Sequence, residues 1–316
     1  YTSVSDKDLS DFLKNYQIGK VISLTEISEG VENSNFLLKT NINSYILTLY
    51  ENRVNVEDLP FFMSLIGELF ENGISCPRPI RNLYGNIINR CAGKYATMVT
   101  FLDGKTAQFT NLERCSQLGK ALARLHLTTL KTSLHRKNML GPENWLSILN
   151  ATNDENSSLP SGLKKEAIHH IGHIVTSWPV SLPKGVIHAD LFPNNAMFIN
   201  DRLTGIIDFY FACNDFYAYD LAVCLNSWCF ENDTNFNTKK ARRLINSYQK
   251  IRKLRKEEIN ALPILAQGAA ARFFATRYYD WHHTPSDALV KKHDPIEYWN
   301  KITYLKSNAN INLYGF

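Results

Sequence analysis

The sequence predicts an α+β protein in two parts, a small N-terminal part built on an antiparallel sheet and a larger C-terminal part that is mostly helical. Three strand-like runs separated by turn residues fill positions 21–50, whereas apolar residues recur at helical spacing between positions 220 and 305. The chain has 316 residues, of which 44% are hydrophobic, enough for a large core and more typical of two domains than of one. We therefore expect domains at residues 1–102 and 103–316.

The composition argues against several classes of protein. No segment reaches about 18 consecutive apolar residues, and the N-terminus lacks the basic and apolar regions of a signal peptide, so we expect a cytoplasmic protein without a membrane partner. The net charge is only +5, and the main basic run, residues 250–256, contains no aromatic residue, which favours a solvated helix face over a nucleic-acid site. The six cysteines form no C-x-x-C pair, so free buried thiols are expected.

The N-terminal part begins with an amphipathic helix over residues 5–16 and continues as a meander. Its strands are expected at Val21 to Ile27, Asn35 to Thr40 and Ser44 to Tyr50. The first connection contains Gly30, Asn33 and Ser34. A Gly among small polar residues lets backbone N–H groups approach phosphates closely, so we expect these three residues to bind a nucleotide. A helix over Pro60 to Asn72 follows, with Pro in its first turn and a Gly after its end.

Two more strands and a series of helices complete the predicted elements. The strands are expected at Asn86 to Arg90 and Tyr95 to Leu102, and the second runs toward Gly104. Helical spacing predicts helices at Asn111 to Leu130, Leu163 to Trp178, Asp220 to Phe230, Thr238 to Leu254, Lys256 to His282 and Pro295 to Leu305. Residues 151–162 are polar and predict a surface loop.

The chemistry is concentrated in the stretch from Gly185 to Ile199. His188, Asp190 and Asn195 lie between two apolar runs, and Asp208 ends a third. A carboxylate can orient a hydroxyl and take its proton, and Mg²⁺ needs oxygen ligands such as those of Asn195 and Asp208. The spacing H-x-D-x-x-x-x-N, followed by D-F, has the form of a kinase catalytic loop, in which His188 would hold the loop by hydrogen bonds. The alternative is an ordinary turn between two hairpin strands.

The order of the motifs resembles the aminoglycoside and choline kinase superfamily. In that superfamily an H-G-D-x-x-x-x-N loop, an I-D-W/F segment and a D-P-x-Y-D-L-A segment follow one another, and here the third motif reads D-F-Y-A-Y-D-L-A over residues 215–222. Residues 118–126 also resemble the L-G-x-x-L-A-x-L-H helix of the superfamily. The resemblance implies a two-lobed protein-kinase-like fold, with ATP and Mg²⁺ as cofactors.

The same resemblance assigns two strands to the nucleotide. Ile46 and Thr48 share a strand face, so Ile46 would cover the adenine, while Thr48 stands where other kinases have a basic residue for the phosphates. Backbone groups from Val99 to Phe101 would pair with the adenine. Metals, loop amides or another base such as Lys39 would then meet the phosphate charge. Because of Thr48, a nucleotide-binding pseudokinase is an alternative.

The acceptor must be inferred from the C-terminal helices. Residues 239–306 contain 15 Lys or Arg and 6 Asp or Glu, a balance of +9 that would repel a polycationic aminoglycoside. Aromatic residues such as Trp228 and Trp281 leave a choline kinase open, because choline binds in aromatic cages. Ethanolamine and methylthioribose kinases are further alternatives.

Residues 271–298 resemble the C-terminal segment of the homoserine kinases of this superfamily, as do residues 45–51, which include Thr48, and 59–62. This resemblance implies phosphorylation of L-homoserine by MgATP to O-phospho-L-homoserine, a step toward threonine. An Arg fork suits the substrate carboxylate and an acidic side chain suits its ammonium. We therefore expect Arg272, Arg277 and Asp280 to contact the substrate.

Overall fold

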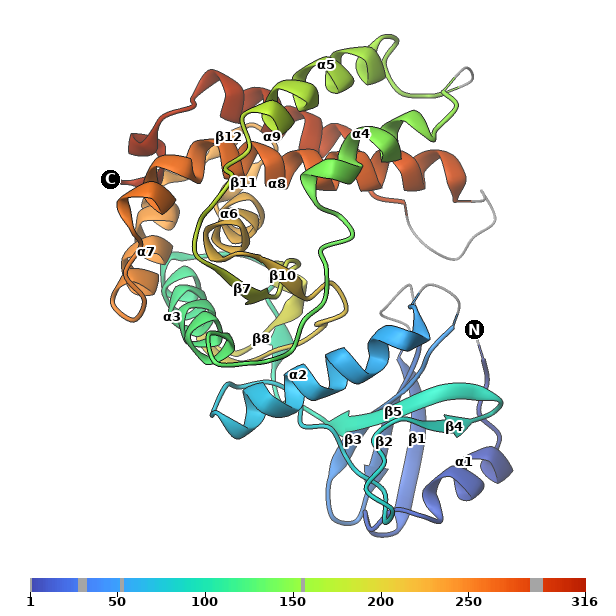
Figure 1. Cartoon of the computed structure of the whole chain (residues 1–316). Coiled ribbons are helices and arrows are strands. Elements are labelled where there is room, and N and C mark those ends of the chain that lie inside the picture. Colours follow the sequence, from blue (N-terminus) through green and yellow to red (C-terminus); the bar gives the residue numbers. More distant parts are fainter. Residues whose placement is uncertain (1, 28–32, 52–53, 155–156, 285–291) are drawn as a thin grey trace. The chain divides into compact units, whose positions relative to one another are not determined.

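The structure, a computed structural model, describes residues 2–27, 33–51, 54–154, 157–284 and 292–316 (Figure 1). Contacts within the chain divide it into two compact units. Unit 1 consists of Tyr1–Lys105, Met197–Ile199 and Thr204–Tyr210, and unit 2 of Thr106–Ala196, Asn200–Leu203 and Phe211–Phe316. Unit 1 contains a five-stranded sheet and unit 2 contains most of the helices, so the predicted α+β class is confirmed.

Unit 1 is built on an antiparallel sheet with the strand order β1-β2-β3-β5-β4. Its strands are β1 (Val21–Ile27), β2 (Ser34–Thr40), β3 (Ser44–Leu49), β4 (Asn89–Cys91) and β5 (Lys94–Thr100). The predicted meander is confirmed. β4 begins three residues later than predicted because the side chain of Asn82 accepts the N–H groups of Tyr84 and Asn86, which keeps that segment in a turn.

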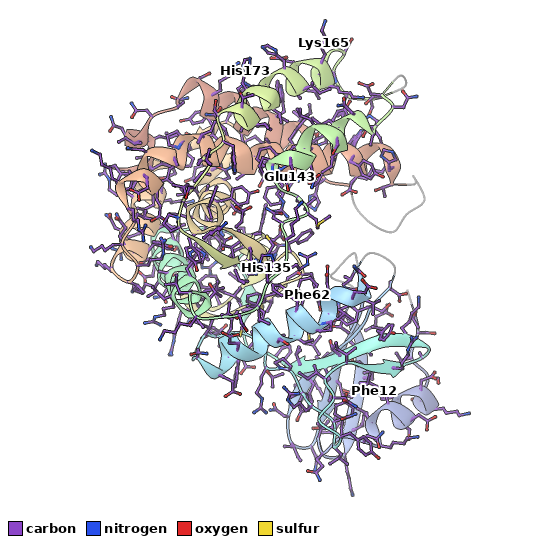
Figure 2. All side chains as sticks on the ribbon, in the orientation of Figure 1. Phe12, Phe62, His135, Glu143, Lys165 and His173 are labelled. Atoms are coloured by element: carbon purple, nitrogen blue, oxygen red, sulfur yellow. The ribbon has the colours of Figure 1, made fainter. Side chains whose placement is uncertain are left out.

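Two helices belong to unit 1. α1 (Asp6–Leu13) begins with a capping box, in which Ser5 and Asp8 each accept the other's N–H group. Phe12 on this helix is buried in the same apolar core as Leu38 of the sheet (Figure 2). α2 (Leu59–Glu71) has Pro60 in its first turn and ends before Gly73, whose φ of 78° suits glycine. Both helices were predicted.

Unit 2 is mainly helical. Its helices are α3 (Leu112–Thr129), α4 (Pro142–Asn150), α5 (Leu163–Thr176), α6 (Tyr217–Trp228), α7 (Thr238–Gln249), α8 (Lys256–His283) and α9 (Ile296–Ser307). α6 is buried on nearly every side and packs against α8, which also packs against α4 and α9, while α3 packs against α7. All except the short α4 were predicted from apolar spacing.

The strands around the predicted catalytic loop do not form a hairpin with each other. β7 (Lys184–Ile187) pairs with β10 (Cys213–Phe216), whereas β8 (Ala196–Ile199) belongs to a three-stranded sheet of order β6-β8-β9, with β6 at Lys105–Thr106 and β9 at Arg202–Ile206. The alternative of an ordinary hairpin turn is therefore wrong. Another small sheet pairs β11 (Phe230–Asn232) with β12 (Asn235–Phe236).

Three expectations from composition have structural outcomes. In the described part of the chain, no helix is long and apolar enough to cross a membrane. All six cysteines are free and buried, as predicted. The basic run at residues 250–256 is not a helix face, because most of it connects α7 to α8. Its Arg252 is buried, and the guanidinium forms an ion pair with Glu258 there.

Candidate active site

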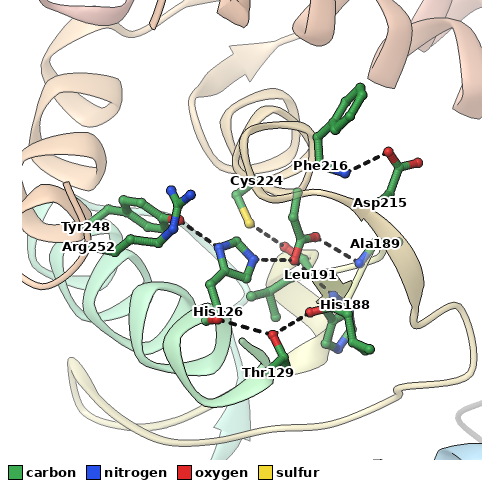
Figure 3. Close-up of polar contacts among 12 residues, drawn as sticks. His126, Thr129, His188, Ala189, Leu191, Asp215, Phe216, Cys224, Tyr248 and Arg252 are labelled. Carbon is green, nitrogen blue, oxygen red and sulfur yellow. Dashed lines mark hydrogen bonds and ion pairs between the residues drawn. The ribbon is translucent and has the colours of Figure 1, made fainter. Parts of the chain in front are cut away.

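The loop after β7 holds Asp190 on a constrained backbone. Ala189 occupies the glycine position of the superfamily pattern and has a φ of 63°, which costs an L-residue on the order of 1 kcal/mol. The carboxylate of Asp220 stabilises this conformation, because Oδ2 accepts the N–H of His188 at 2.9 Å and Oδ1 accepts that of Ala189 at 2.8 Å. Figure 3 shows this part of the loop. Helix α6, which carries Asp220, therefore fixes the conformation of the loop.

Asp220 is one end of a chain of polar side chains. Its Oδ2 lies 3.0 Å from Nε2 of His126, and Nδ1 of His126 lies 2.7 Å from the hydroxyl of Tyr248 (Figure 3). Arg252 donates to the Tyr248 hydroxyl at 3.1 Å and forms an ion pair with Glu258 at 2.9 Å. All five residues are buried. The chain connects the catalytic loop to α7 and to the start of α8.

Burial and hydrogen bonding determine the charge states of Asp220 and His126. Burial alone would raise the pKa of Asp220, but the hydrogen bonds that it accepts, first that from His126 and then that from the His188 N–H, leave that pKa lowered. Burial also lowers the pKa of His126 and outweighs the opposing effect of Asp220. His126 is therefore neutral, donates from Nε2 to a charged Asp220, and accepts from Tyr248 at Nδ1. The loop is anchored by a buried carboxylate that accepts three hydrogen bonds.

The side chain of Asp190 has partners in unit 2 and keeps part of its surface exposed. The Asn195 amide donates to Oδ2 of Asp190 at 3.1 Å and to its backbone carbonyl at 2.8 Å. A guanidinium nitrogen of Arg272 lies 3.8 Å from Oδ1, and 17% of the Asp190 side chain is exposed. His188 is fully buried, and its Nδ1 accepts the N–H of Asp190 at 3.2 Å. His188 therefore contributes to the shape of the loop, while the Asp190 carboxylate can reach a bound molecule.

The three predicted substrate residues have different surroundings. Arg272 is buried, donates to the carbonyl of Ala189, and stacks over Phe273 with its guanidinium carbon 4.2 Å from the ring centre. Arg277 is bound instead to the carboxylate of Glu297. Asp280 is exposed on α8. Of the three, Arg272 is the residue that the structure brings to the catalytic loop.

In unit 1, Thr48 lies beside a row of hydroxyl groups. It is 5% exposed, and its hydroxyl donates to Oδ1 of Asn35 at 2.8 Å. Thr97, which stands opposite Thr48, ends a row of three hydroxyl groups. The Tyr210 hydroxyl lies 2.9 Å from that of Tyr50, which lies 2.8 Å from that of Thr97. The strand register explains the arrangement, because Thr48 stands opposite both Asn35 and Thr97.

Asp208, the predicted metal ligand in unit 1, lies two residues before Tyr210 in the sequence. It has a φ of 64° and is exposed. Burial, aided by the charge of Asp208, raises the pKa of Tyr50 to about 12 despite the hydrogen bonds from Thr97 and Tyr210. Tyr50 is therefore protonated at neutral pH. The row of neutral hydroxyls ties the segment after β9 to the sheet.

The predicted oxygen donors suit a hard cation. The amide nitrogen of Asn195 donates both hydrogen bonds of this side chain. These bonds therefore do not involve Oδ1, the atom that Mg²⁺ would bind. The carboxylate of Asp208 is exposed. An amide oxygen and a carboxylate are the donor types that Mg²⁺ prefers, with waters and substrate phosphates completing the coordination.

The residues predicted to bind phosphate in the first connection are held by the chain itself. Ser34 donates to Glu51 at 2.7 Å, and Asn33 accepts the N–H of Glu51 at 3.3 Å. Lys94 completes the cluster at 3.0 Å from Glu51. Although burial acts in the opposite direction, the hydrogen bonds from Ser34 and Lys94 lower the pKa of Glu51 to about 2. Gly30 lies outside the described residues.

The predicted adenine contacts lie on neighbouring strands. Ile46 of β3 stands opposite Val99 of β5, and both side chains are half-buried. The N–H groups of Thr100 and Phe101 donate to backbone carbonyls of unit 1 at 2.9 and 3.1 Å. These two donors are already engaged, so adenine recognition by this segment would use other backbone groups.

The two tryptophans that the choline-kinase alternative would use as an aromatic cage have other partners in the structure. The indole of Trp228 is buried and donates to the carbonyl of Leu191 at 2.9 Å, which places it under the catalytic loop. The indole of Trp281 donates to Ser158 at 3.2 Å. Sequence reasoning also missed the functional support given by Tyr248, Arg252 and Tyr210, because their partners are distant in sequence and form no spaced motif.

Comparison with known proteins agrees with this geometry. Residues 23–254 match the phosphotransferase enzyme family. The chain is 47% identical over 315 residues to the homoserine kinase of Rhodospirillum rubrum, with coverage of 100% of this chain and 98% of the relative. It is 46% identical over 315 residues to the homoserine kinase of Rhizobium meliloti, with coverage of 100% and 97%.

Solved structures share the fold at lower identity. An amicoumacin kinase in complex with AMP-PNP, Ca²⁺ and Ami superposes with a TM-score of 0.73 and 15% identity, covering 96% of this chain and 93% of that one. A spectinomycin phosphotransferase in complex with ADP and spectinomycin gives a TM-score of 0.68 and 15% identity, with coverage of 99% and 98%. The predicted kinase-like fold is confirmed by these similarities.

Proposed function

The chain belongs to the homoserine kinases of the phosphotransferase enzyme family, and on that premise we propose how its residues transfer a phosphoryl group from ATP to the hydroxyl of L-homoserine. The observation that carries the proposal is the setting of Asp190. Its carboxylate is partly exposed, is hydrogen-bonded to Asn195, and lies on a loop whose backbone is held by the buried Asp220. A fixed carboxylate that is partly exposed is what a hydroxyl acceptor requires.

In the proposed reaction, Asp190 orients the homoserine hydroxyl and receives its proton. The hydroxyl oxygen forms a bond to the γ-phosphorus while the bond from that phosphorus to the β,γ-bridging oxygen breaks, and ADP leaves with the electron pair. Asn195 and Arg272 hold the two carboxylate oxygens of Asp190 in one orientation. The product is O-phospho-L-homoserine, and its formation is a step toward threonine. We propose that the reaction takes place in the cytoplasm.

Mg²⁺ would be held by Oδ1 of Asn195 and the carboxylate of Asp208. When bound, it would neutralise charge on the phosphates of ATP. The protein's own contribution is to position these oxygens. Asn195 does so by directing its amide nitrogen toward Asp190, and the hydroxyl row does so by holding the segment that follows Asp208.

For the substrate carboxylate we propose Arg272 rather than Arg277. Arg272 already lies beside Asp190, whereas Arg277 would first have to release Glu297. Glu297 would keep its ion pair with Lys301, but the favourable pairing with Arg277 would be lost. Asp280, exposed on α8, stays the predicted partner of the substrate ammonium.

For the nucleotide we propose Ile46 and Val99 as the adenine surface. Thr48 is assigned a positional role, because its hydroxyl donates to Asn35 inside unit 1. Asn33 and Ser34 are proposed to shape the phosphate loop through Glu51, leaving backbone N–H groups, including that of Gly30, to approach the phosphates.

A coupled assay of ADP release with homoserine, choline, methylthioribose and kanamycin tests the proposal. The expected result is turnover with homoserine at a kcat/KM at least about a hundredfold above that of each other acceptor, since a site that pairs charged groups rejects analogues lacking them. Preference for another acceptor would overturn the substrate. ATP binding without turnover of any acceptor would identify a pseudokinase.

A further inference from the structure

A pair of histidines on α5 lies outside everything assigned above. α5 buries Leu163, Ala167, His170, Ile171 and Ile174, and leaves His169 and His173 exposed. The two exposed residues are four positions apart, the spacing that places side chains one turn above each other on a helix. Figure 2 shows His173 and the exposed Lys165 on this helix. The pair is therefore open to solvent and independent of the catalytic loop.

The geometry of the pair suits a metal ion. The Nε2 atoms of His169 and His173 lie 3.3 Å apart, and the ring planes are inclined at 87°. Zinc binds imidazole nitrogen at about 2.0–2.1 Å in tetrahedral geometry, which places two ligand nitrogens about 3.3 Å from each other. One ion could thus bind both Nε2 atoms with little movement of either ring. Two histidines at this spacing on a helix also form the ligand pair of the H-E-x-x-H zinc motif.

We propose that His169 and His173 form a surface chelate for a borderline divalent transition metal such as Zn²⁺ or Ni²⁺. Imidazole suits these ions, whereas the oxygen ligands proposed for the catalytic metal suit Mg²⁺. In the described part of the chain no three His, Cys, Asp or Glu side chains cluster as a metal site. The chelate therefore has two protein ligands and completes its coordination with water, which makes it exchangeable rather than structural.

The surroundings of the pair limit its affinity. Lys165 and Glu166 lie one turn before His169 on α5, and their opposite charges nearly balance near the ion. Binding requires both Nε2 atoms to be unprotonated, so protons compete with the metal ion for the pair. A single exposed histidine lacks the second, intramolecular ligand that raises affinity.

The test is a titration of the full-length chain, without an affinity tag or nucleotide, with Zn²⁺ and separately with Ni²⁺, read by calorimetry. The expected result is one site whose affinity falls at least about tenfold in His169→Ala and in His173→Ala, because either change destroys the chelate. His135→Ala, which removes another exposed histidine, is the matched control and should leave the affinity unchanged.

Two outcomes would overturn the proposal. One is a wild-type affinity equal to that of the His169→Ala and His173→Ala double variant, and the other is an affinity that His135→Ala lowers as much as the single changes do. Because both histidines are exposed, the variants should keep the wild-type thermal unfolding midpoint without metal. His173→Gln supplies a second variant of similar size should His173→Ala unfold.

Discussion

The two units hold their proposed functional carboxylates by different means. In unit 2, the backbone before Asp190 is bound by a buried, charged Asp220, which is itself hydrogen-bonded to His126. In unit 1, the segment after Asp208 is bound by the neutral hydroxyls of Tyr210 and Tyr50. A charged group thus binds the backbone next to the proposed base, whereas neutral hydroxyls bind the segment after the proposed metal ligand.

The difference follows from what each carboxylate must do. A base has to meet one hydroxyl within hydrogen-bond distance, and small displacements reduce the rate steeply. A metal ligand has a more tolerant task, because waters and phosphates complete the coordination of Mg²⁺. The comparison therefore predicts large effects from changes in the anchor of unit 2 and small effects from changes in the hydroxyl row of unit 1.

The largest effect is expected at the base. Asp190→Asn should keep the fold and ATP binding while kcat falls roughly 10²- to 10⁴-fold, the usual contribution of a positioned base. Steady-state kinetics with homoserine measures it. The same change at the exposed Asp280 should raise KM for homoserine and leave kcat nearly unchanged. A variant at Asp190 with wild-type turnover would remove the catalytic assignment.

Next in size is the loss of the charged anchor. Asp220→Ala should lower the free energy of unfolding by about 3–5 kcal/mol, because three donors lose their acceptor in a buried site and the left-handed Ala189 loses its support. All five tryptophans lie in unit 2, so urea denaturation followed by tryptophan fluorescence reports on that unit. Thr48→Ala, in unit 1, is the control and should leave that transition in place. Equal shifts in both variants would contradict the comparison.

A smaller effect on activity is expected for the metal ligands. Asp208→Ala and Asn195→Ala each remove an oxygen that we assign to Mg²⁺, so the Mg²⁺ concentration at half-maximal rate should rise. Asn195→Ala should also lower kcat, since it removes the hydrogen bond to Asp190. Rates measured over a range of Mg²⁺ concentrations distinguish the two. Curves that superimpose on wild type would show that neither residue binds the metal.

The anchor of unit 2 also predicts a dependence of stability on pH. The pKa of His126 is lowered by burial from 6.5, so below pH 6.5 the unfolded chain binds a proton that the folded chain does not. Stability from this residue is complete above pH 6.5 and is lost as the pH falls toward the folded pKa. In His126→Asn the slope should be shallower by up to about 1.4 kcal/mol per pH unit. Denaturation between pH 5 and 8 measures it, and an unchanged slope would mean that folding does not shift the pKa of His126.

Most of the fold could be predicted because its signals are local. Apolar spacing predicted the helices, including α1, whose start the structure shows to be capped by Ser5 and Asp8. The pairing of β7 with β10 could not be predicted, because its two strands are far apart in sequence and no turn residue links them. α4 was missed because only nine residues form it, and just two of these, Trp145 and Leu149, are buried.

For the candidate site, the spacing of Asp190, Asn195 and Asp208 predicted the catalytic segments, and these roles stay a prediction. No spacing in the sequence indicated the residues that support these segments. Tyr248 reaches His126 across 122 positions, and Tyr210 reaches Tyr50 across 160. Strand alternation placed Thr48 correctly beside Ile46 on β3, yet gave no indication that its hydroxyl is already bound.

The smallest expected effect is that of Thr48→Ala. The change leaves Asn35 short of one neutral hydrogen bond, so kcat/KM should fall by an amount equivalent to about 1 kcal/mol or less. Asn35→Ala removes the same bond from the other side and serves as the matched variant. If both act through this bond, the double variant should lose less than the sum of the two single losses. A loss above about 3 kcal/mol in Thr48→Ala alone, expressed as a higher KM for ATP, would instead place the hydroxyl on a phosphate, since that exceeds the contribution of one neutral hydrogen bond. Nucleotide binding would then depend on one hydroxyl of unit 1. The expectation that changes in unit 1 have only small effects would be wrong.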